Sequence, residues 1–352
     1  MFIPLNNLKR ETDSIRTKLD DVINSVIDNS DFILGDELKK FEQDFARYCE
    51  AKYCLGVDSG TSALELACRS IGLDQDDEVI TVSNSYISTS TSALFVGAKP
   101  VFVDVDYNSK NIHVDEIGSK INSKTKAIIV VHMHGYPCDM DAILKIAKEN
   151  NLFVIEDASH AHGAIYRNSK IGSFGDITCF SFYPSKNLGC MGDGGAITTN
   201  NKDLYERIKL MRTYGESEKF HHTELGYNKR LDNLQAGILN VKLTHLDQWN
   251  TARQNAAKMY NDLLDSILNI PEIQSDRTSV FYVYSINSTN RDQLQEFLTT
   301  KNIQTSIHYP IPIHKQKLFV DLGYSDKLPV TEQLANEMLS LPMFPLITED
   351  EI

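Results

Sequence analysis

The stretch Ala127-Ile128-Ile129-Val130-Val131 contains five apolar residues in a row, four of them β-branched. A strand with one face in water alternates apolar and polar residues, whereas a strand buried on both faces is apolar throughout. This stretch therefore predicts an inner strand of a sheet that is covered on both faces, which is typical of parallel sheets in α/β proteins.

Similar β-rich segments recur on both sides of this stretch, and helix-like segments lie between them. The other candidate strands are Tyr53–Val57, Glu78–Ser83, Pro100–Val105, Leu152–Ile155, Ile177–Phe182 and Ala196–Thr199. The candidate helices between them are Ser62–Ile71, Ser88–Val96 and Met140–Glu149. Alternation of this kind predicts an α/β fold with a largely parallel sheet and right-handed crossovers.

The pattern changes in the last third of the chain. Residues 231–267 show helical spacing of apolar side chains and predict one long helix. A strand at Phe281–Ile286, a helix at Arg291–Lys301 and a strand at Gln304–Ile307 are expected to follow. We therefore predict a large domain over residues 1–245, with an N-terminal helical segment, and a small α+β domain over residues 246–352.

Composition narrows the classes of function. The 352 residues carry a net charge of −13, which argues against a basic surface for nucleic acid. No apolar run approaches the roughly 18 residues that a membrane-spanning helix needs, and the apolar part of the N-terminus is too short for a signal peptide. The six cysteines contain no C-x-x-C pair and are expected to be reduced core thiols. These features predict a cytoplasmic protein.

Lys186 is the first candidate catalytic residue. It follows the aromatic segment Phe180-Ser181-Phe182-Tyr183 and precedes the glycine-rich turn Gly192-Asp193-Gly194-Gly195. A partly desolvated lysine can lose its proton and form a Schiff base with a carbonyl, which is how pyridoxal 5'-phosphate (PLP) is held. A solvated loop lysine is the common alternative, so the hypothesis depends on finding the rest of a cofactor site.

Two further pieces of such a site follow candidate strands. Gly60 and Thr61 come directly after Tyr53–Val57 and open a helix, whose N-terminus can bind a phosphate; a plain N-cap is the alternative. Asp157 ends a buried strand, where ligands of open α/β sheets bind, and its carboxylate can face a pyridine nitrogen. His160, three residues on, can donate to the ring oxygen. An N-cap aspartate is the alternative for Asp157.

Tyr86 and Asn228 complete the predicted cofactor site. Tyr86 follows the strand Glu78–Ser83 and can stack on a planar ring, although such aromatics usually serve packing. Asn228 precedes the long helical stretch and can reach a phosphate, although an asparagine at a helix start is common. The order of these pieces, with Asp157 preceding Lys186 by 29 positions (186 − 157), resembles the large domain of PLP enzymes of the aspartate-aminotransferase fold (fold type I).

Two other kinds of site are not favoured. His132 and His134 are spaced i, i+2, but no nearby cysteine or carboxylate completes a tetrahedral set, so no metal site is predicted. Gly189-Cys190-Met191-Gly192-Asp193-Gly194 has the wrong spacing for the G-x-G-x-x-G fingerprint, which argues against a dinucleotide-dependent dehydrogenase.

Longer sequence motifs resemble the DegT/DnrJ-type PLP-dependent nucleotide-sugar aminotransferases over essentially the whole chain. The matching motifs are Ser59-Gly60-Thr61-Ser62-Ala63-Leu64, Asp77-Glu78-Val79-Ile80-Thr81, Glu156-Asp157-Ala158-Ser159-His160-Ala161-His162-Gly163-Ala164 and Leu341-Pro342-Met343-Phe344-Pro345. The resemblance implies a homodimer whose two active sites use residues of both subunits. The sequence ends at Ile352, ahead of the last helix that the resemblance leads us to expect.

The resemblance assigns a role to each candidate residue. Lys186 is expected to be the Schiff-base lysine and the proton shuttle, Asp157 to face the pyridine nitrogen and His160 the ring oxygen. His160 stands where many members have glutamine, and both can donate to that oxygen. Tyr86 is expected to stack on the ring. The phosphate is expected to be held by Thr61, Ser181 and, from the partner subunit, Asn228.

Within the family, three motifs resemble enzymes that aminate C-3 of dTDP-linked 3-keto-6-deoxyhexoses. They are Ser181-Phe182-Tyr183-Pro184 with the Gly192–Gly195 turn, Gly226-Tyr227-Asn228-Lys229-Arg230-Leu231-Asp232, and Ser306-Ile307-His308-Tyr309-Pro310. They imply an amino transfer from L-glutamate that yields a 3-amino-3,6-dideoxyhexose for a polysaccharide such as O-antigen, or for an antibiotic. Tyr183, His308 and Tyr309 are then candidate sugar contacts.

Three alternatives stay open at this point. The substrate can instead be a UDP-3-keto sugar or a keto-cyclitol, and C-4 amination is a further possibility. A PLP-binding regulator is the third alternative. A sugar dehydratase is less favoured, because relatives of that kind carry histidine in place of Lys186.

Overall fold

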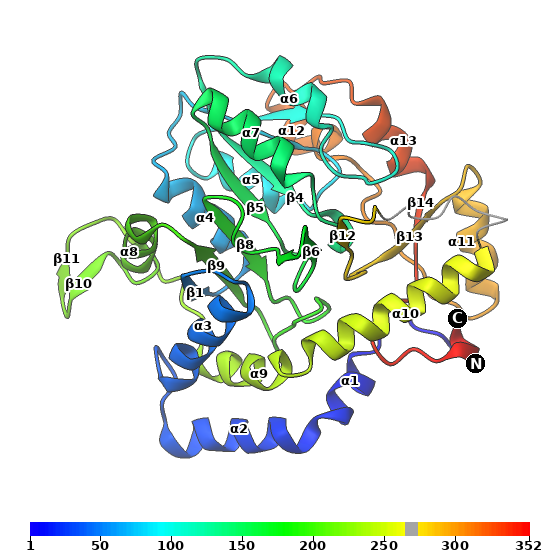
Figure 1. The fold of residues 1–352 in the computed structure, drawn as a ribbon, viewed down its shortest axis with the longest axis horizontal. Helices are drawn as coiled ribbons and strands as arrows, with labels where there is room; N and C mark the ends of the chain where they lie inside the picture. The colour runs from blue at the N-terminus through cyan, green and yellow to red at the C-terminus, as the bar shows by residue number, and fades with distance from the viewer. Residues whose placement is uncertain (265–273) are drawn as a thin grey trace.

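A seven-stranded sheet forms the centre of this computed structural model, which describes residues 1–264 and 274–352 (Figure 1). The strands lie in the order β1-β9-β8-β5-β4-β2-β3. Neighbouring strands are parallel from β8 to β3, whereas β9 runs antiparallel to both β8 and β1. The bounds are β1 Tyr53–Val57, β2 Glu78–Val82, β3 Lys99–Val103, β4 Thr125–Val131, β5 Phe153–Asp157, β8 Ile177–Ser181 and β9 Gly195–Thr199. The predicted, largely parallel α/β sheet is confirmed.

Strand β4 is buried on both faces, as its composition predicts. Every residue of the strand except Lys126 is buried. Ile128 and Val130 belong to one hydrophobic cluster, whereas Ala127 and Ile129 belong to another. Because successive side chains of a strand point to opposite faces, these two clusters are the cores on the two sides of the sheet.

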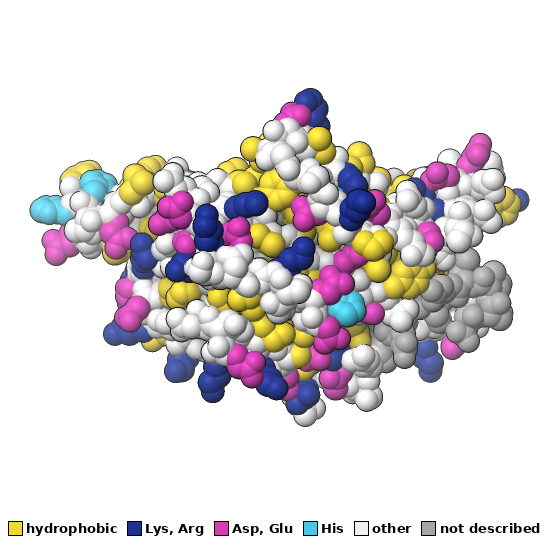
Figure 2. Space-filling view, turned by 90° about the horizontal axis from the view of Figure 1, so that it is seen from above, with side chains coloured by type: hydrophobic (Ala, Val, Ile, Leu, Met, Phe, Trp, Pro, Cys, Tyr) yellow, Lys and Arg dark blue, Asp and Glu magenta, His cyan; other side chains and the backbone are white. Residues whose placement is uncertain are grey.

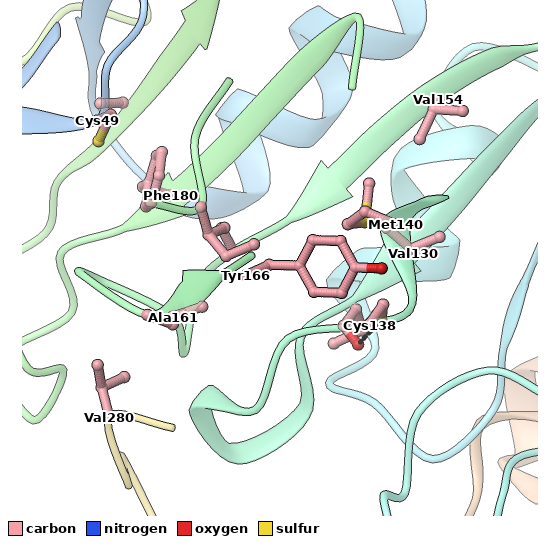
Figure 3. Packing of buried hydrophobic residues seen from close by; sticks show 14 of the residues in the cluster. Cys49, Val130, Cys138, Met140, Val154, Ala161, Tyr166, Phe180 and Val280 are labelled. Atoms are coloured by element: carbon pink, nitrogen blue, oxygen red, sulfur yellow. Dashed lines mark hydrogen bonds between the residues drawn. The ribbon is translucent and has the colours of Figure 1, made fainter. Parts of the chain in front are cut away.

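Helices cover both faces of the sheet. The first cluster includes apolar side chains of α3 Asp36–Tyr48, α6 Val114–Lys120, α7 Met140–Asn150, α9 Asn233–Leu243 and α13 Pro329–Glu337. The second cluster includes side chains of α4 Gly60–Ser70, α5 Ser88–Leu94 and α8 Lys202–Met211. Figure 3 shows part of the first cluster, where the ring of Tyr166 extends toward Met140, Val130 and Cys138. The molecule is therefore a three-layer α/β structure.

The remaining elements lie around this core. The helices are α1 Leu8–Ser14, α2 Arg16–Asn29, α10 Leu246–Leu264, α11 Arg291–Thr300 and α12 Lys317–Asp321, with 3₁₀ turns η1 Met133–Gly135, η2 Ile313–Lys315 and η3 Glu349–Glu351. Short strands are β6 Ile165–Tyr166, β7 Ser169–Lys170, β10 Glu216–Glu218, β11 His221–His222 and β12 Arg277–Thr278. The hairpin β10–β11 projects from the body, and the two termini lie close together (Figure 1). Arg10 and Glu351 form an ion pair of 2.8 Å between the terminal segments.

The prediction of one helix over residues 231–267 is wrong for the described part, and residues 265–267 lie outside it. Helix α9 ends at Leu243 and α10 begins at Leu246. Between them, the Thr244 hydroxyl donates to Val241 O at 2.8 Å, and the amide of His245 donates to Lys242 O. Threonine side chains compete for helical carbonyls in this way, which explains why apolar periodicity alone missed the break.

The predicted strand at Gln304–Ile307 does not form. In this segment Ser306 makes a single bridge, to Ser340, while the amide of Gln304 bonds Ile3 O. The second strand of the small sheet is instead β14 Met338–Leu341, which pairs antiparallel with β13 Tyr284–Asn287. Phe319 and Leu328 pack on Phe102 of β3, so the C-terminal segment also contacts the large sheet. The domain boundary at residue 245 stays a prediction.

The buried cysteines agree with the compositional analysis. All six cysteines are buried and carry free thiols. In the described ranges, no helix has both the length and the apolar character needed to cross a bilayer. On the face seen in Figure 2, Lys and Arg side chains lie among Asp and Glu side chains, so this face has no extended surface of one sign.

Candidate active site

A cavity of about 490 Å³ lies at the carboxyl ends of β5 and β8 and the N-terminus of α4. All the predicted site residues except Asn228 line it: Gly60, Thr61, Tyr86, Asp157, His160, Ser181, Tyr183, Lys186, His308 and Tyr309. They come from segments far apart in the sequence that meet because parallel strands end at the same edge of the sheet. The structure thus gathers these residues around one space.

Asp157 is the last residue of β5 and is buried. The Thr89 hydroxyl donates to its Oδ2 at 2.7 Å, and the amide of Ser159 donates to its Oδ1 at 3.2 Å. These bonds leave acceptor capacity free, since an ionised carboxylate has about four lone-pair sites. The strand end and Thr89 therefore present an oriented carboxylate to the cavity.

Lys186 lies in the loop after β8, where its amide bonds Tyr183 O at 2.8 Å. The side chain is partly exposed to the cavity, and its dense surroundings lower the pKa of the amine through desolvation, an effect that Tyr282 and Asp157 partly oppose. A lowered pKa raises the fraction of neutral amine, which is the form that attacks a carbonyl. The loop thus provides a lysine suited to Schiff-base formation.

The start of α4 forms a polar pocket beside β8. A Cβ at Gly60 would lie 2.6 Å from Cβ of Ser181, so only glycine allows the helix to approach the strand this closely. The hydroxyls of Thr61 and Ser88 lie 2.6 Å apart, and Ser59 caps the helix through the amide of Ser62. A helix N-terminus with several hydroxyls is suited to bind a phosphate group.

His160 is buried against the ring of Tyr282, with centroids 4.5 Å apart and planes at 27°. Burial, reinforced by the nearby Lys186, holds the pKa of His160 well below its usual value, so the imidazole is neutral. Its Nδ1 is buried and has no hydrogen-bond partner in the described residues. A buried polar atom of this kind requires a partner, which a bound ligand in the cavity can supply.

The outer part of the cavity is built mainly of aromatic residues on loops. Tyr86 and Tyr183 are 58% and 57% exposed, and the ring of Tyr86 lies 6.0 Å from that of Tyr309. The Nδ1 of His308 lies 2.8 Å from the Ser340 hydroxyl, and burial lowers the pKa of His308 to about 4. This rim is therefore open, aromatic and largely neutral.

Comparison with known proteins now identifies the class. The DegT/DnrJ/EryC1/StrS aminotransferase family model matches residues 13–352. The chain belongs to this family. It is therefore an aminotransferase, and the predicted aspartate-aminotransferase-like fold and PLP cofactor are confirmed.

Two curated relatives and one solved structure illustrate the similarity. The chain is 43% identical to the dTDP-3-amino-3,6-dideoxy-alpha-D-galactopyranose transaminase of Aneurinibacillus thermoaerophilus, over 100% of this chain and 97% of that protein. It is 42% identical to a pleiotropic regulatory protein of Geobacillus stearothermophilus, over 100% of this chain and 96% of that protein. DesV of S. venezuelae, solved in complex with a ketimine intermediate, superposes with a TM-score of 0.97 at 37% identity, over 99% and 95% of the two chains.

The cavity of this aminotransferase fits the cofactor. The close approach of Gly60 to Ser181 and the hydroxyls beside it suit the phosphate, and the unpartnered Nδ1 of His160 suits the ring oxygen. Asn228 lies outside the cavity, where its backbone bridges Thr213. Its predicted contact from a partner subunit stays a prediction.

Three residues of the site were missed from the sequence. Thr89 and Ser88 belong to the run Ser88-Thr89-Ser90-Thr91-Ser92, whose hydroxyls on a helix next to a sheet edge were a usable signal. Tyr282 precedes β13 in an aromatic and apolar segment and carries no signal that separates it from core residues.

The two histidines considered as metal ligands, His132 and His134, form hydrogen bonds within the protein. His132 Nε2 lies 3.0 Å from Glu156 Oε2, and its Nδ1 accepts from the amide of Cys138. His134 Nδ1 lies 3.1 Å from the Ser285 hydroxyl. Across the two described ranges, no group of three His, Cys, Asp or Glu side chains is placed to hold a metal ion.

Proposed function

We propose that this enzyme transfers an amino group from L-glutamate to C-3 of a dTDP-linked 3-keto-6-deoxyhexose, giving a 3-amino-3,6-dideoxyhexose. The main support for this reaction is that the amine of Lys186 and the carboxylate of Asp157 line the same cavity in a chain of this aminotransferase family. The sugar and the nucleotide are supported by the motifs around Tyr183 and His308, and by the 43% identity to a dTDP-3-amino-3,6-dideoxyhexose transaminase.

Bound PLP supplies the electron sink that stabilises negative charge on the carbon undergoing proton transfer. Asp157, oriented by Thr89 and Ser159, holds the proton on the pyridine nitrogen through its charge. His160 donates from Nδ1 to the ring oxygen, which requires the neutral tautomer with its proton on that atom. Gly60, Thr61 and Ser181 would hold the phosphate together with Asn228 of a partner subunit.

Lys186 moves the proton. With the cofactor bound, its Nζ would take up and release the proton of the donor carbon, and desolvation favours the neutral amine that can accept it. Because the loop after β8 fixes the backbone of Lys186 beside the ends of β5 and β8, the amine is positioned without a large rearrangement. This positioning is what the fold contributes to the reaction.

The aromatic rim binds the substrates. Tyr86 would pack on the ring of the cofactor, while Tyr183, His308 and Tyr309 would contact the sugar, since all four line the cavity. A neutral His308 can donate a hydrogen bond to a sugar hydroxyl, or accept one from it, while the imidazole carries no charge. We further propose that the enzyme acts as a cytoplasmic homodimer and that its product serves polysaccharide biosynthesis.

The test is a substrate panel. Purified protein is loaded with PLP and incubated with glutamate and, in separate reactions, dTDP-, UDP- and GDP-linked 3-ketosugars, the 4-keto isomers and a keto-cyclitol. We expect fastest turnover with the dTDP-linked 3-keto-6-deoxyhexose and a product whose NMR spectrum places the amine on C-3. Preference for a UDP-sugar, for a cyclitol or for C-4 would contradict the proposed substrate. Absence of any cofactor-band change with any amino acid would instead favour a regulator.

A further inference from the structure

Tyr282 is held rigidly on the wall of the cavity, yet the proposed function gives it no task. Its ring stacks on His160, with centroids 4.5 Å apart. Its hydroxyl lies 3.3 Å from the Ser185 hydroxyl, and its amide donates to His134 O at 3.0 Å. Three contacts on the ring, the hydroxyl and the backbone thus fix both the place and the tilt of the ring.

The face of this ring is turned to the catalytic amine. Nζ of Lys186 lies 4.2 Å from the ring centroid of Tyr282. No carboxylate in residues 1–264 or 274–352 forms an ion pair with Lys186, although Asp157 lies close enough to influence it. A cation within about 6 Å of an aromatic centroid is attracted by the negative face of the ring, most strongly where water is excluded.

We propose that Tyr282 is a positioning residue whose aromatic face holds Lys186 in its protonated form during proton transfer. The proposal rests on the proposed function, in which Nζ takes a proton from the donor carbon and then returns it. Burial penalises the ammonium group at the moment when it carries that proton. The ring compensates this penalty and keeps Nζ at a fixed place, while Tyr282 itself neither gains nor loses a proton.

Among the groups around Lys186, Tyr282 and Asp157 are the ones that stabilise its ammonium form. Four histidines feel the charge of Lys186 and are held neutral mainly by desolvation: the buried His134, His160 and His162, and the half-buried His308. Burial by itself raises the pKa of the Tyr282 phenol, but the charge of Lys186 and hydrogen bonds of the phenol with Ser185 and with Lys186 bring it below its usual value. The phenol and the amine therefore influence each other, and variants must separate the hydroxyl from the ring.

The test uses three kinds of variant. Tyr282→Phe removes the hydroxyl and keeps the ring, whereas Tyr282→Leu removes both. A Tyr282→Phe series with one, two and three ring fluorines weakens the negative face while the shape stays nearly constant. Tyr205→Leu is the control, because it removes a ring that stacks on Tyr53 outside the cavity.

The first measurement needs no turnover. PLP is added to cofactor-free protein, and the rate at which the Schiff-base absorbance appears is followed against pH, which reports the midpoint at which the Lys186 amine loses its proton. We expect the midpoint to move about one pH unit lower in Tyr282→Leu and to stay near that of the wild type in Tyr282→Phe. Each added fluorine should lower the midpoint pH further.

The second measurement is the single-turnover half-reaction with glutamate. We expect the rate to fall about 10- to 30-fold in Tyr282→Leu, with the half-saturating glutamate concentration little changed, and to fall in steps with fluorination. A wild-type midpoint and rate in Tyr282→Leu overturn the proposal. So does an equal loss in the Phe and Leu variants, which would assign the effect to the hydroxyl.

Two further outcomes are decisive. If Tyr282→Leu does not fold, the fluorinated series decides. A midpoint and a rate that do not change with the number of fluorines overturn the proposal. If the wild-type protein shows no half-reaction with any amino acid, the proposed function fails. The midpoint shift in the cofactor-free protein then still decides whether the ring of Tyr282 holds the amine.

Discussion

The inner and outer halves of the active-site cavity are built in different ways. The inner half consists of residues at the end of β5, at the start of α4 and in the short loops after β5 and β8, and Gly60, Asp157 and His160 are all buried there. The outer half consists of loop residues, and Tyr86 and Tyr183 are more than half exposed. The inner half is therefore fixed by the sheet, whereas the rim can vary without disturbing the core.

This difference separates the chemistry from the choice of substrate. The inner half provides an amine, a carboxylate and a phosphate pocket, which every reaction of this class requires. The rim provides aromatic rings and a neutral histidine, which can distinguish one sugar nucleotide from another. Substitutions in the inner half should lower the rate of proton transfer, and substitutions in the rim should change substrate binding.

Replacing the amine gives the largest expected effect. Lys186→Ala removes both the Schiff base and the proton carrier, so transamination should fall by about 10⁴-fold or more. Stopped-flow absorbance of the glutamate half-reaction measures it. The control is Lys202→Ala, an exposed lysine at the start of α8, which should keep wild-type rates. Appreciable turnover in Lys186→Ala would contradict the assignment of Lys186 as Schiff-base lysine and proton carrier.

Removing the charge of the carboxylate gives the next effect. Asp157→Asn keeps the shape but no longer stabilises a protonated pyridine nitrogen, and we expect the half-reaction to slow about 10²- to 10³-fold. The matched control is Asp176→Asn, in which the carboxylate that accepts from Val154 N near the opposite end of β5 is changed. That variant should lose some stability and keep its catalytic rate. Equal rate losses in the two variants would contradict the proposed role.

Acid should destabilise the native protein through His162, which is buried against the rings of Phe180 and Phe182. Burial lowers the pKa of His162 to about 3, whereas the unfolded residue titrates near 6.5. Between these values the unfolded chain binds the proton and the native protein does not, so stability is present above about pH 6.5 and is lost as the pH falls below it. We expect about 1 to 2 kcal/mol of this loss between pH 6.5 and 5 to come from His162.

His162→Phe tests this assignment, because the imidazole packs against the rings of Phe180 and Phe182, with centroids 5.5 Å and 5.7 Å away, and a phenyl ring can keep these contacts without titrating. Chemical denaturation at pH 5 and pH 7 should show a smaller pH dependence in the variant than in the wild type. An unchanged pH dependence would mean that His162 is not a source of the acid sensitivity.

The rim gives the smallest effect. Tyr183→Phe removes one hydroxyl at the open end of the cavity, and we expect KM for the sugar nucleotide to rise about three- to tenfold. The glutamate half-reaction should be unchanged, since that step depends on the inner half. Steady-state kinetics with the ketosugar varied provide the measurement. A slower glutamate half-reaction would break the division between the two halves.

The same division explains what the sequence could predict. Strand β4 was recognisable because its apolar run needs no information from elsewhere in the chain. Asp157 ends one strand of this kind, and Lys186 lies in the loop that follows another. The break at Thr244 depends on one side-chain hydrogen bond, which periodicity does not reveal. The short strand β14 is defined by its pairing with β13 rather than by its composition.

The missed site residues follow the same logic. Thr89 serves the site by bonding Asp157, and Tyr282 serves it by lying under Lys186 and against His160. Both roles come from contacts between segments that are distant in the chain. The run of hydroxyls around Thr89 could have marked that segment, but no pattern within one segment shows which residue it contacts, and Tyr282 emerged only from the three-dimensional arrangement.

The central claim is that Lys186 is the residue to which PLP is bound in this cavity. Reduction of the PLP-loaded protein with borohydride, followed by proteolysis and peptide mass spectrometry, tests it directly. The account predicts a single pyridoxyl label on the peptide that contains Lys186, and no label when glutamate is added before the reductant. A label on another lysine, or no covalent label in the untreated holoenzyme, would contradict it.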